Sequence, residues 1–324
     1  MRIAVLGLGS IGARHLANAV ALGHRAVGFD PVAAQAEAVC RQAGATPAGS
    51  RADALAQCDA VVVASPSAAH LADLAAAVDA GRHALVEKPF AHTAEGLGAI
   101  LDRAEAAGAT VAVAQNLRHH PAVERARALV ERTAYGPVLA AVAVGASYLP
   151  DWRPGQDYRQ GYAADPQTGG AIFDWVHEID LLAHLLGPFA VAGATAQAGR
   201  CLDMAAEENA GLLLRHDGGA LSTVLLSYAT RPPLRRTTLL GPGGRIEIDI
   251  PGRRLTILDA AGEPVEDSAF GGAHADDYRA ELADFVAAAA AGRPPRCPAR
   301  EALAILGGVL AARRLAGLPQ AGAT

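Results

Sequence analysis

Residues 1–30 of the chain read MRIAVLGLGSIGARHLANAVALGHRAVGFD. An apolar run, 3–6, leads straight into GLGSIG at 7–12, which has the spacing G-x-G-x-x-G and precedes an alanine-rich segment of helical length. This spacing binds a dinucleotide when it follows a strand and opens a helix. A second apolar run, 25–29, then leads to Asp30. The segment therefore predicts the first βαβ unit of a Rossmann domain.

Each position of this glycine turn has a role in the predicted cofactor site. Gly7 permits the tight turn, Gly9 lets the backbone approach a pyrophosphate, and Gly12 lets the helix pack against the strand. Ser10 and Ile11 begin the helix, whose N-terminus offers free N–H groups to the phosphates. An ordinary glycine-rich connection between a strand and a helix is the alternative interpretation.

Asp30 indicates which dinucleotide to expect. A carboxylate at the end of the second strand, 18 residues after Gly12, accepts hydrogen bonds from ribose hydroxyls and repels a 2′-phosphate. Pro31 and Val32 follow, so no adjacent arginine is present to hold that phosphate. NAD is therefore predicted in preference to NADP. Asp-Pro is also a good helix start, which makes Asp30 a candidate N-cap as well.

Strand-like and helix-like segments alternate over the first third of the chain. The expected strands are 3–6, 25–29, 60–64, 84–86 and 110–114, and the expected helices are 12–22, 32–43, 68–80 and 94–107. The strands are apolar almost throughout, as in a parallel sheet covered on both faces. The prediction is an α/β fold whose residues 1–117 form a Rossmann domain with a doubly wound parallel sheet.

The pattern changes after residue 117. The expected helices are 121–131, 174–186, 274–291 and 299–316, and the expected strands are 138–147, 189–197, 210–215, 220–227, 236–240, 245–250 and 254–258. Turn signals separate consecutive strands. We therefore expect residues 118–324 to form an α+β domain with a large, mostly antiparallel open sheet that serves substrate binding and oligomerisation. An apolar open face needs a cover, which favours a homodimer or homotetramer.

Composition excludes several classes of function. The 324 residues carry a formal net charge of −5, which provides no basic face for nucleic acid or an anionic membrane. The longest apolar runs are too short to span a bilayer. The four cysteines lack C-x-x-C spacing, so neither a metal site nor a disulfide framework is expected. The first residues lack the features of a signal peptide, and a cytoplasmic location is expected.

Further motifs are spaced along nearly the whole chain. They are the glycine turn with His15 just after it, Ser65-Pro66 with His70, Glu87-Lys88-Pro89, Asn116-Leu117-Arg118 with His120-Pro121, and Gly169-Gly170 leading to His177-Glu178-Ile179-Asp180. Their order and spacing resemble the Gfo/Idh/MocA family of sugar and polyol dehydrogenases. The resemblance implies an NAD(P)-dependent oxidoreductase that acts on CH–OH groups.

The resemblance assigns a catalytic role to Lys88 and implies a cis bond between Lys88 and Pro89. Lys88 follows an expected strand, at the edge where ligands bind in open parallel sheets. Its ammonium can donate to a reacting oxygen or exchange a proton with it. A solvated surface lysine is the alternative. The cofactor-binding candidates in this part of the chain are Ser65, Pro66, His70, Glu87 and Lys88.

His177 is the second catalytic candidate. Asp174 and Asp180 lie three residues before and after it, so two carboxylates would share its helix face. Such a carboxylate can fix the tautomer and raise the basicity of an imidazole. The resemblance makes His177 the proton acceptor for the substrate hydroxyl. The family's usual aspartate lies four residues before the histidine, where this chain has Phe173.

That departure leaves three arrangements open. Asp174 serves as the catalytic aspartate, Asp180 substitutes for it, or Lys88 and His177 act alone. The structural alternative is a helix capped by Asp174, with His177 packed under the sheet.

The irregular stretch 148–159 resembles a subgroup of the family linked to nucleotide-sugar or nonulosonic-acid pathways. Arg153 and Arg159 are candidates to clamp a phosphate or carboxylate, and Trp152 is a candidate to stack on a sugar ring. A subunit contact or a lid without substrate chemistry is the alternative. The substrate-binding candidates are Asn116, Arg118, Arg153, Asp157, Tyr158 and Asp180.

We therefore expect hydride transfer between NAD and a hydroxyl-bearing carbon of a sugar, cyclitol or nucleotide sugar. Two alternatives remain on the same fold, since fold does not determine function. One is a glycosidase that oxidises its substrate transiently and releases no NADH. The other is a non-catalytic NAD-bound sensor, whose output would survive Lys88→Ala.

Overall fold

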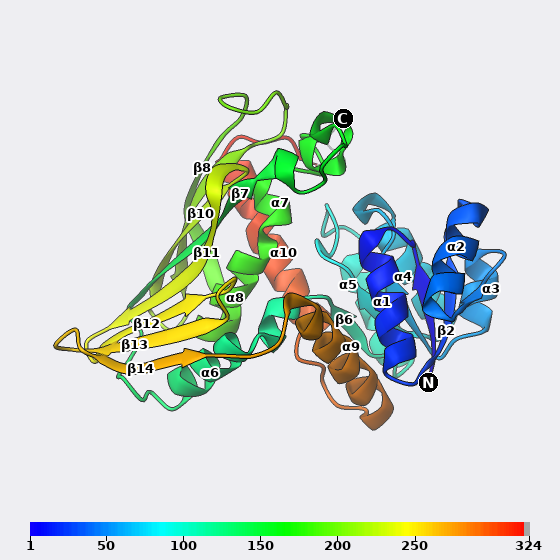
Figure 1. Ribbon diagram of the computed structural model, residues 1–324, viewed down its shortest axis with the longest axis horizontal. Helices are drawn as coiled ribbons and strands as arrows, with labels where there is room; N and C mark the ends of the chain where they lie inside the picture. Colours follow the sequence, from blue (N-terminus) through cyan, green and yellow to red (C-terminus); the bar gives the residue numbers. More distant parts are fainter. Residues whose placement is uncertain (321–324) are drawn as a thin grey trace. The chain divides into compact units, whose positions relative to one another are not determined.

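The computed structural model describes residues 1–320, which form two units (Figure 1). Met1–Asn116 and Ala273–Leu303 make up the first unit, and Leu117–Gly272 with the chain from Ala304 onward makes up the second. The chain first passes from one unit to the other between Asn116 and Leu117, which agrees with the predicted boundary at residue 117. The segment Ala273–Leu303 differs from the prediction, which places it in the second domain. Residues 321–324, the end of that predicted domain, lie outside the described residues.

The first unit contains a parallel sheet with the strand order β3-β2-β1-β4-β5-β6, which is that of a Rossmann domain. Its strands are β1 (Arg2–Leu6), β2 (Arg25–Phe29), β3 (Thr46–Pro47), β4 (Ala60–Val63), β5 (His83–Val86) and β6 (Val111–Val113). The connecting helices are α1 (Ser10–Ala21), α2 (Ala33–Ala43), α3 (Arg51–Ala56), α4 (His70–Asp79) and α5 (Leu97–Ala106). The predicted fold class is confirmed. The sequence does not reveal β3 and α3, because a two-residue strand and a six-residue helix are too short to show a period.

The strand order reverses between β1 and β4, so their carboxyl ends border the crevice where ligands bind in this fold. The glycine turn follows β1, Ser65 follows β4, and Lys88 follows β5, the next strand of the sheet. Three of the predicted motifs therefore lie at the same edge.

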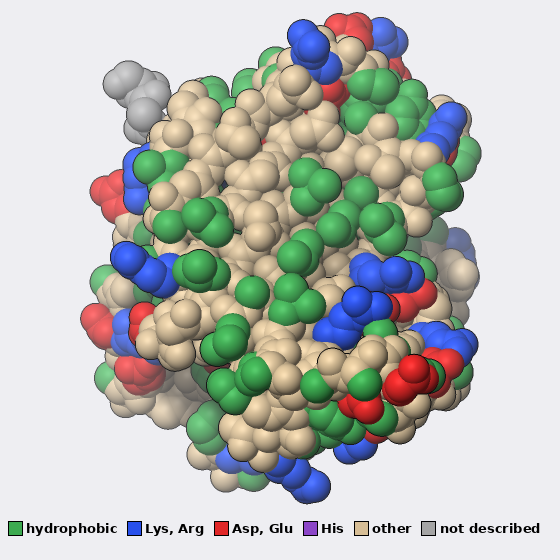
Figure 2. Space-filling view, turned by 90° about the vertical axis from the view of Figure 1, so that its left-hand side faces the viewer, with side chains coloured by type: hydrophobic (Ala, Val, Ile, Leu, Met, Phe, Trp, Pro, Cys, Tyr) green, Lys and Arg blue, Asp and Glu red, His purple; other side chains and the backbone are tan. Residues whose placement is uncertain are grey.

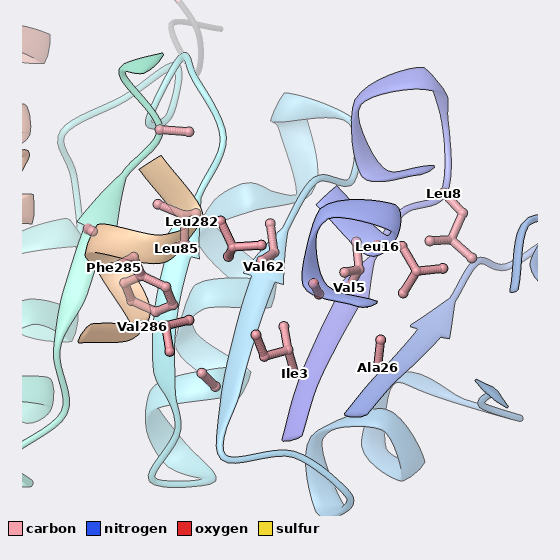
Figure 3. Close-up of a cluster of buried hydrophobic side chains, with 14 of the residues drawn as sticks. Ile3, Val5, Leu8, Leu16, Ala26, Val62, Leu85, Leu282, Phe285 and Val286 are labelled. Atoms are coloured by element: carbon pink, nitrogen blue, oxygen red, sulfur yellow. The ribbon is translucent and has the colours of Figure 1, made fainter. Parts of the chain in front are cut away.

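Helix α9 (His274–Ala291) explains why a late segment belongs to the first unit. Leu282, Phe285 and Val286 of this helix join the buried cluster formed by side chains such as Ile3 and Leu85 (Figure 3). Burying side chains of this kind is worth roughly 1.5–3 kcal/mol each. A helix pattern predicts its own apolar residues but not the sheet on which they pack.

The second unit contains a mixed sheet with the order β14-β13-β12-β11-β7-β10-β9-β8, in which the pair β7–β10 is parallel and the other pairs are antiparallel. The strands are β7 (Ala140–Tyr148), β8 (Phe189–Gln197), β9 (Asn209–His216), β10 (Leu221–Ser227), β11 (Ala229–Gly241), β12 (Gly244–Asp249), β13 (Arg254–Asp259) and β14 (Pro264–Ala269). The predicted large, mostly antiparallel sheet is confirmed. The edge strand β14 was not predicted because its sequence, PVEDSA, contains only one large apolar side chain, Val265.

Helices α6 (Pro121–Glu131) and α8 (Val176–Leu186) pack on the same sheet, α6 against β12 and β13 and α8 against β7 and β10. The last helix, α10 (Ala299–Leu315), begins in the first unit and ends in the second. Helix α8 comes close to the sheet because Gly145 of β7 has no side chain: a Cβ there would lie 2.8 Å from Trp175 and 2.9 Å from Glu178. Within residues 1–320, no helix combines the length and hydropathy needed to cross a membrane.

Candidate active site

The glycine turn is closely packed at Gly7 and Gly12 and open at Gly9. Gly7 has a φ of +82°, and a Cβ on it would lie 2.5 Å from the backbone of the loop after β4. A Cβ on Gly12 would overlap the carbonyl oxygen of Gly7. A Cβ on Gly9, by contrast, would have no neighbour within 4 Å in the described part of the chain. Gly9 is the N-cap of α1 and no side chain caps this helix, so Ser10 and Ile11 begin an N-terminus that fits a pyrophosphate.

Asp30 is held next to this turn by backbone donors. Its Oδ2 accepts the N–H of Leu8 at 2.9 Å, and its Oδ1 accepts the N–H of Val32 at 3.0 Å. The N-cap of α2 is Val32, so the alternative role of Asp30 as the cap of that helix is wrong. Each carboxylate oxygen has a further lone pair, which fits the ribose of a dinucleotide whose pyrophosphate lies over the turn.

The loop that carries Lys88 is anchored by a buried contact between Glu87 and His15. The bond between Lys88 and Pro89 is cis, as the resemblance implies. Glu87 Oε1 lies 2.8 Å from Nε2 of the fully buried His15, and Glu87 Oε2 accepts the backbone N–H of Lys88 at 3.0 Å. Burial by itself raises the pKa of Glu87, but the hydrogen bond and charge of His15, with help from Lys88, outweigh it and leave the pKa below its usual value. Glu87 therefore stays ionised and fixes the start of the Lys88 loop.

Lys88 is the only lysine of the chain. Lysine and arginine together number 28, so 27 basic positions carry arginine. Arginine remains protonated in proteins, whereas a lysine amine can release and regain a proton. A single lysine at the ligand-binding edge of the sheet, in a chain that otherwise uses arginine, points to a position where a transferable proton is needed.

His70 ties the loop after β4 to the loop after β5. Its Nε2 lies 2.9 Å from the carbonyl oxygen of Ser65, and its Nδ1 lies 2.9 Å from the carbonyl oxygen of Pro89. Burial lowers the pKa of His70 and outweighs the opposing effect of these carbonyls. The Ser65 hydroxyl donates to Asp73 Oδ2 at 2.7 Å, and Pro66 is exposed at the start of the next short helix. Ser65 and His70 therefore hold the loops that border the crevice.

The predicted helix over 174–186 is wrong at its start. Asp174 ends the short helix α7 (Ala171–Asp174), Trp175 has φ −90° and ψ 26°, and α8 begins at Val176. Asp174 therefore does not share a regular helix face with His177. The break follows from tertiary contacts, because Trp175 packs over Gly145 while the carboxylate of Asp174 is bound from other elements.

Two tyrosines donate hydrogen bonds to the Asp174 carboxylate, and neither was predicted from the sequence. Tyr162 donates to Asp174 Oδ1 at 2.9 Å, and Tyr228 donates to Asp174 Oδ2 at 2.7 Å. Tyr228 is fully buried, and burial together with the Asp174 charge raises its pKa well above the ordinary value, so it remains a donor. Tyr228 lies 54 residues from Asp174 in the chain, and no local pattern links the two.

His177 lies in the first turn of α8 and is 8% exposed. One turn later, Asp180 forms a two-pronged ion pair with Arg118: Nε to Oδ2 at 2.9 Å and the terminal nitrogen to Oδ1 at 2.7 Å. Both side chains are only 1% exposed. Although both are candidates for substrate binding, this burial points to a positioning role, in which they fix α8 and so His177. Asn116 is also buried, and its Nδ2 has no hydrogen-bond partner within residues 1–320.

The Gly169-Gly170 motif is packed against a second buried ion pair. A Cβ on Gly170, which has φ +92°, would overlap the carboxylate of Glu207. That carboxylate accepts from Arg313 of α10 at 3.0 Å and from the backbone N–H of Ile172 at 3.1 Å. Arg313 and Glu207 are fully buried. The pair holds the start of α7. Glu207 and Arg313 lie 106 residues apart, so no sequence motif links them.

The irregular stretch predicted to bind substrate encloses a cavity of about 480 Å³, here called the loop cavity, which is lined by residues between Leu149 and Ala163. Arg153, Asp157 and Tyr158 all line it. Asp157 is bound by Arg159 at 2.9 Å, whereas Arg153 contacts the ring of Tyr162 at 5.9 Å from its centroid. The same tyrosine therefore faces the loop cavity and binds Asp174.

Comparison with known proteins identifies the family of the chain. The model of an oxidoreductase family with an NAD-binding Rossmann fold, GFO/IDH/MocA, matches residues 1–115, and the model of the GFO/IDH/MocA C-terminal domain matches residues 123–247. UDP-N-acetylglucosamine 3-dehydrogenase of Acidithiobacillus ferrooxidans is 28% identical over 304 residues, which cover 92% of this chain and 91% of that protein. Inositol 2-dehydrogenase of Cereibacter sphaeroides is 32% identical over 193 residues, which cover 57% and 54%.

Solved structures lead to the same family. A structure of the Acidithiobacillus enzyme matches with a TM-score of 0.83 and 25% identity over 97% of both chains. Levoglucosan dehydrogenase in complex with NADH and levoglucosan matches with a TM-score of 0.88 over 98% of this chain and 97% of that one, and at 19% identity this likeness concerns the fold. Two family models, matched in order over most of the sequence, show that the chain belongs to the GFO/IDH/MocA family of oxidoreductases.

Proposed function

We propose that the protein is a cytoplasmic NAD-dependent dehydrogenase that oxidises a secondary hydroxyl of a sugar or cyclitol, free or attached to a nucleotide. The observation that carries the proposal is the only lysine of the chain, anchored through Glu87 at the same sheet edge as the open glycine turn. An ammonium group at a dinucleotide site can donate to the reacting oxygen of an alcohol while a base takes the hydroxyl proton.

Each residue of the proposed site has a separate role in the reaction. When bound, NAD supplies the hydride acceptor. The glycine turn and Asp30 hold the dinucleotide, and Lys88 Nζ donates a hydrogen bond to the reacting hydroxyl oxygen. His177 takes the hydroxyl proton on an imidazole nitrogen, and Asp174 supports it as a carboxylate held ready by Tyr162 and Tyr228.

A turnover screen tests the reaction class. Purified protein and NAD are mixed with separate panels of sugars, cyclitols and nucleotide sugars, and NADH absorbance is followed. We expect at least one class to yield one NADH per substrate oxidised. Product formation without net NADH would instead identify the glycosidase alternative, and NAD binding without turnover on any panel would favour the sensor. The relatives named above are dehydrogenases, which favours neither alternative.

We further propose that NAD is preferred over NADP because Asp30 lies where a 2′-phosphate would bind. In Asp30→Ala, loss of hydrogen bonds to a charged group should weaken NAD binding about 10–100-fold, while NADP binding improves because the repulsion is gone. Asp30→Asn separates the effects, since the amide keeps an acceptor for the Leu8 N–H but loses the charge. Dissociation constants for both dinucleotides are measured by titration. An unchanged NAD to NADP ratio in both variants would contradict this assignment.

We also propose that a second copy of the chain covers the outer face of the eight-stranded sheet. Strand register places one set of exposed apolar side chains on this face, opposite α6 and α8. Figure 2 shows hydrophobic side chains spread over the middle of the face, with charged ones mostly nearer its edges. The set comprises Val142, Leu213, Leu221, Leu225, Leu234 and Leu240, each between 37% and 53% exposed.

A charge placed in the middle of this face tests the homodimer or homotetramer. Leu225→Glu should shift the protein to the monomer in light scattering, because association would bury an unpaired carboxylate. Leu315→Glu, at another exposed leucine outside the sheet, should leave the oligomeric state unchanged. A monomeric unmodified protein, or an oligomer that survives Leu225→Glu, would refute the assignment.

A further inference from the structure

We propose that the loop cavity binds an anionic group, so that the substrate is a sugar carrying a phosphate, a pyrophosphate or a carboxylate. The inference rests on the proposed function, because it identifies the class of sugar that the same enzyme would take. All the residues that support it belong to the second unit.

The loop cavity is large enough to hold a small-molecule ligand. Its volume of about 480 Å³ lies within the range of roughly 300–1,000 Å³ that holds drug-sized ligands. One continuous segment, residues 149–163, provides the lining. The segment is anchored at Tyr158, whose hydroxyl accepts the backbone N–H of Asp203 at 3.0 Å.

Aromatic side chains give the loop cavity a firm wall. Trp152 donates from Nε1 to Ser147 Oγ at 2.6 Å, and its ring meets Trp175 and Tyr228 edge-on, with centroids 5.8 and 5.4 Å apart. Trp152 is nevertheless 39% exposed, so part of its surface stays available. A fixed aromatic surface of this kind provides the apolar contact on which a sugar ring or a planar base packs.

Two charged side chains line the loop cavity, Arg153 and Asp157. The Asp157 carboxylate is already paired with Arg159 at 2.9 Å, and Arg159 also reaches Asp203 at 3.3 Å. Arg231, near the start of the segment, is bound by Asp151. Arg153 lines the loop cavity and has no carboxylate partner in the described part of the chain; its contact is the Tyr162 ring. A guanidinium that is not paired with a carboxylate can bind phosphates and carboxylates through paired, charge-assisted hydrogen bonds.

Tyr162 joins this anion site to the proposed chemistry. Its ring contacts Arg153, and its hydroxyl donates to Asp174 at 2.9 Å, three residues before His177. A ligand whose anion is held by Arg153 would therefore have its sugar along Tyr162, on the side of Asp174. The anion positions the substrate, and the hydroxyl to be oxidised belongs to the sugar.

Tryptophan fluorescence reports occupancy without any redox step. The chain has two tryptophans, Trp152 in the wall and Trp175 in contact with it, so both emit from this site. The protein is titrated with inorganic phosphate, glucose 1-phosphate, UDP, glucuronate, uridine and glucose. Arg153→Gln is compared with Arg132→Gln, a change at an exposed arginine on the C-terminal end of α6.

We expect at least one of glucose 1-phosphate, UDP and glucuronate to change the emission saturably, and its affinity to fall about tenfold or more in Arg153→Gln and with rising salt. Arg132→Gln should bind as the unmodified protein does. The tightest of the three ligands distinguishes phosphate, pyrophosphate and carboxylate. Equal binding of glucose and its phosphate, or unchanged binding in Arg153→Gln, overturns the anion site. Because no NADH is involved, these outcomes are independent of the turnover screen, whose failure alone would count against the dehydrogenase.

Discussion

Replacement of Lys88 by methionine should lower kcat by about 10²–10⁴-fold, which is the usual contribution of a positioned proton donor or acceptor. Methionine keeps the length of the side chain and loses the amine. The backbone N–H of residue 88 still donates to Glu87, so the loop should keep its place and NAD affinity should change little. The measurements are steady-state turnover and the NAD dissociation constant.

Two controls make this prediction specific to Lys88. Lys88→Arg keeps a positive charge, but its longer, planar guanidinium does not place an N–H where Nζ lies, so the variant should remain strongly impaired. An amine-directed reagent should also inactivate the unmodified enzyme by reaction at Lys88, the only lysine of the chain. His177→Asn should show a loss of similar size. Wild-type turnover in both Lys88→Met and His177→Asn would remove the proposed catalytic roles.

Replacement of Arg118 by methionine should destabilise the second unit by about 3–5 kcal/mol, because Asp180 would keep a charge in a place that is 1% exposed. This loss corresponds to a fall in Tm of roughly 10 °C for a unit of this size. Differential scanning calorimetry measures it. Turnover at low temperature should fall as well, since the pair fixes the helix that carries His177.

The double variant Arg118→Met with Asp180→Leu tests the cause. Removing both partners of a buried ion pair is often neutral, whereas removing one leaves an uncompensated charge. The double variant should therefore recover most of the lost stability. Arg127→Met makes the same exchange in the exposed pair with Glu131 on α6, and it should cost about 0.3–0.5 kcal/mol. Equal costs for Arg118→Met and Arg127→Met would contradict the positioning role.

Local sequence was sufficient to define the Rossmann half, the sheet class of the second unit and the place of Lys88. The reason is physical. A strand, a glycine turn and a helix cap are short-range features, and the period of apolar residues is set by neighbours along the chain. The roles of Gly7, Gly9 and Gly12 can be assigned from the sequence, because backbone conformation and close approach depend on the residue type at each position.

The surroundings of the catalytic candidates were decided by tertiary structure. Asp174 is bound by Tyr228 from 54 positions away, and Asp180 by Arg118 from 62 positions away. The expected helix is broken at Trp175, next to the bound Asp174, and this break separates Asp174 from the regular helix that carries His177 and Asp180. The sequence of helix α9 likewise does not indicate which sheet the helix packs on, and only the tertiary structure shows it. A charged side chain is bound by whichever partner the fold brings to it, and helix spacing carries no information about elements that lie far along the chain.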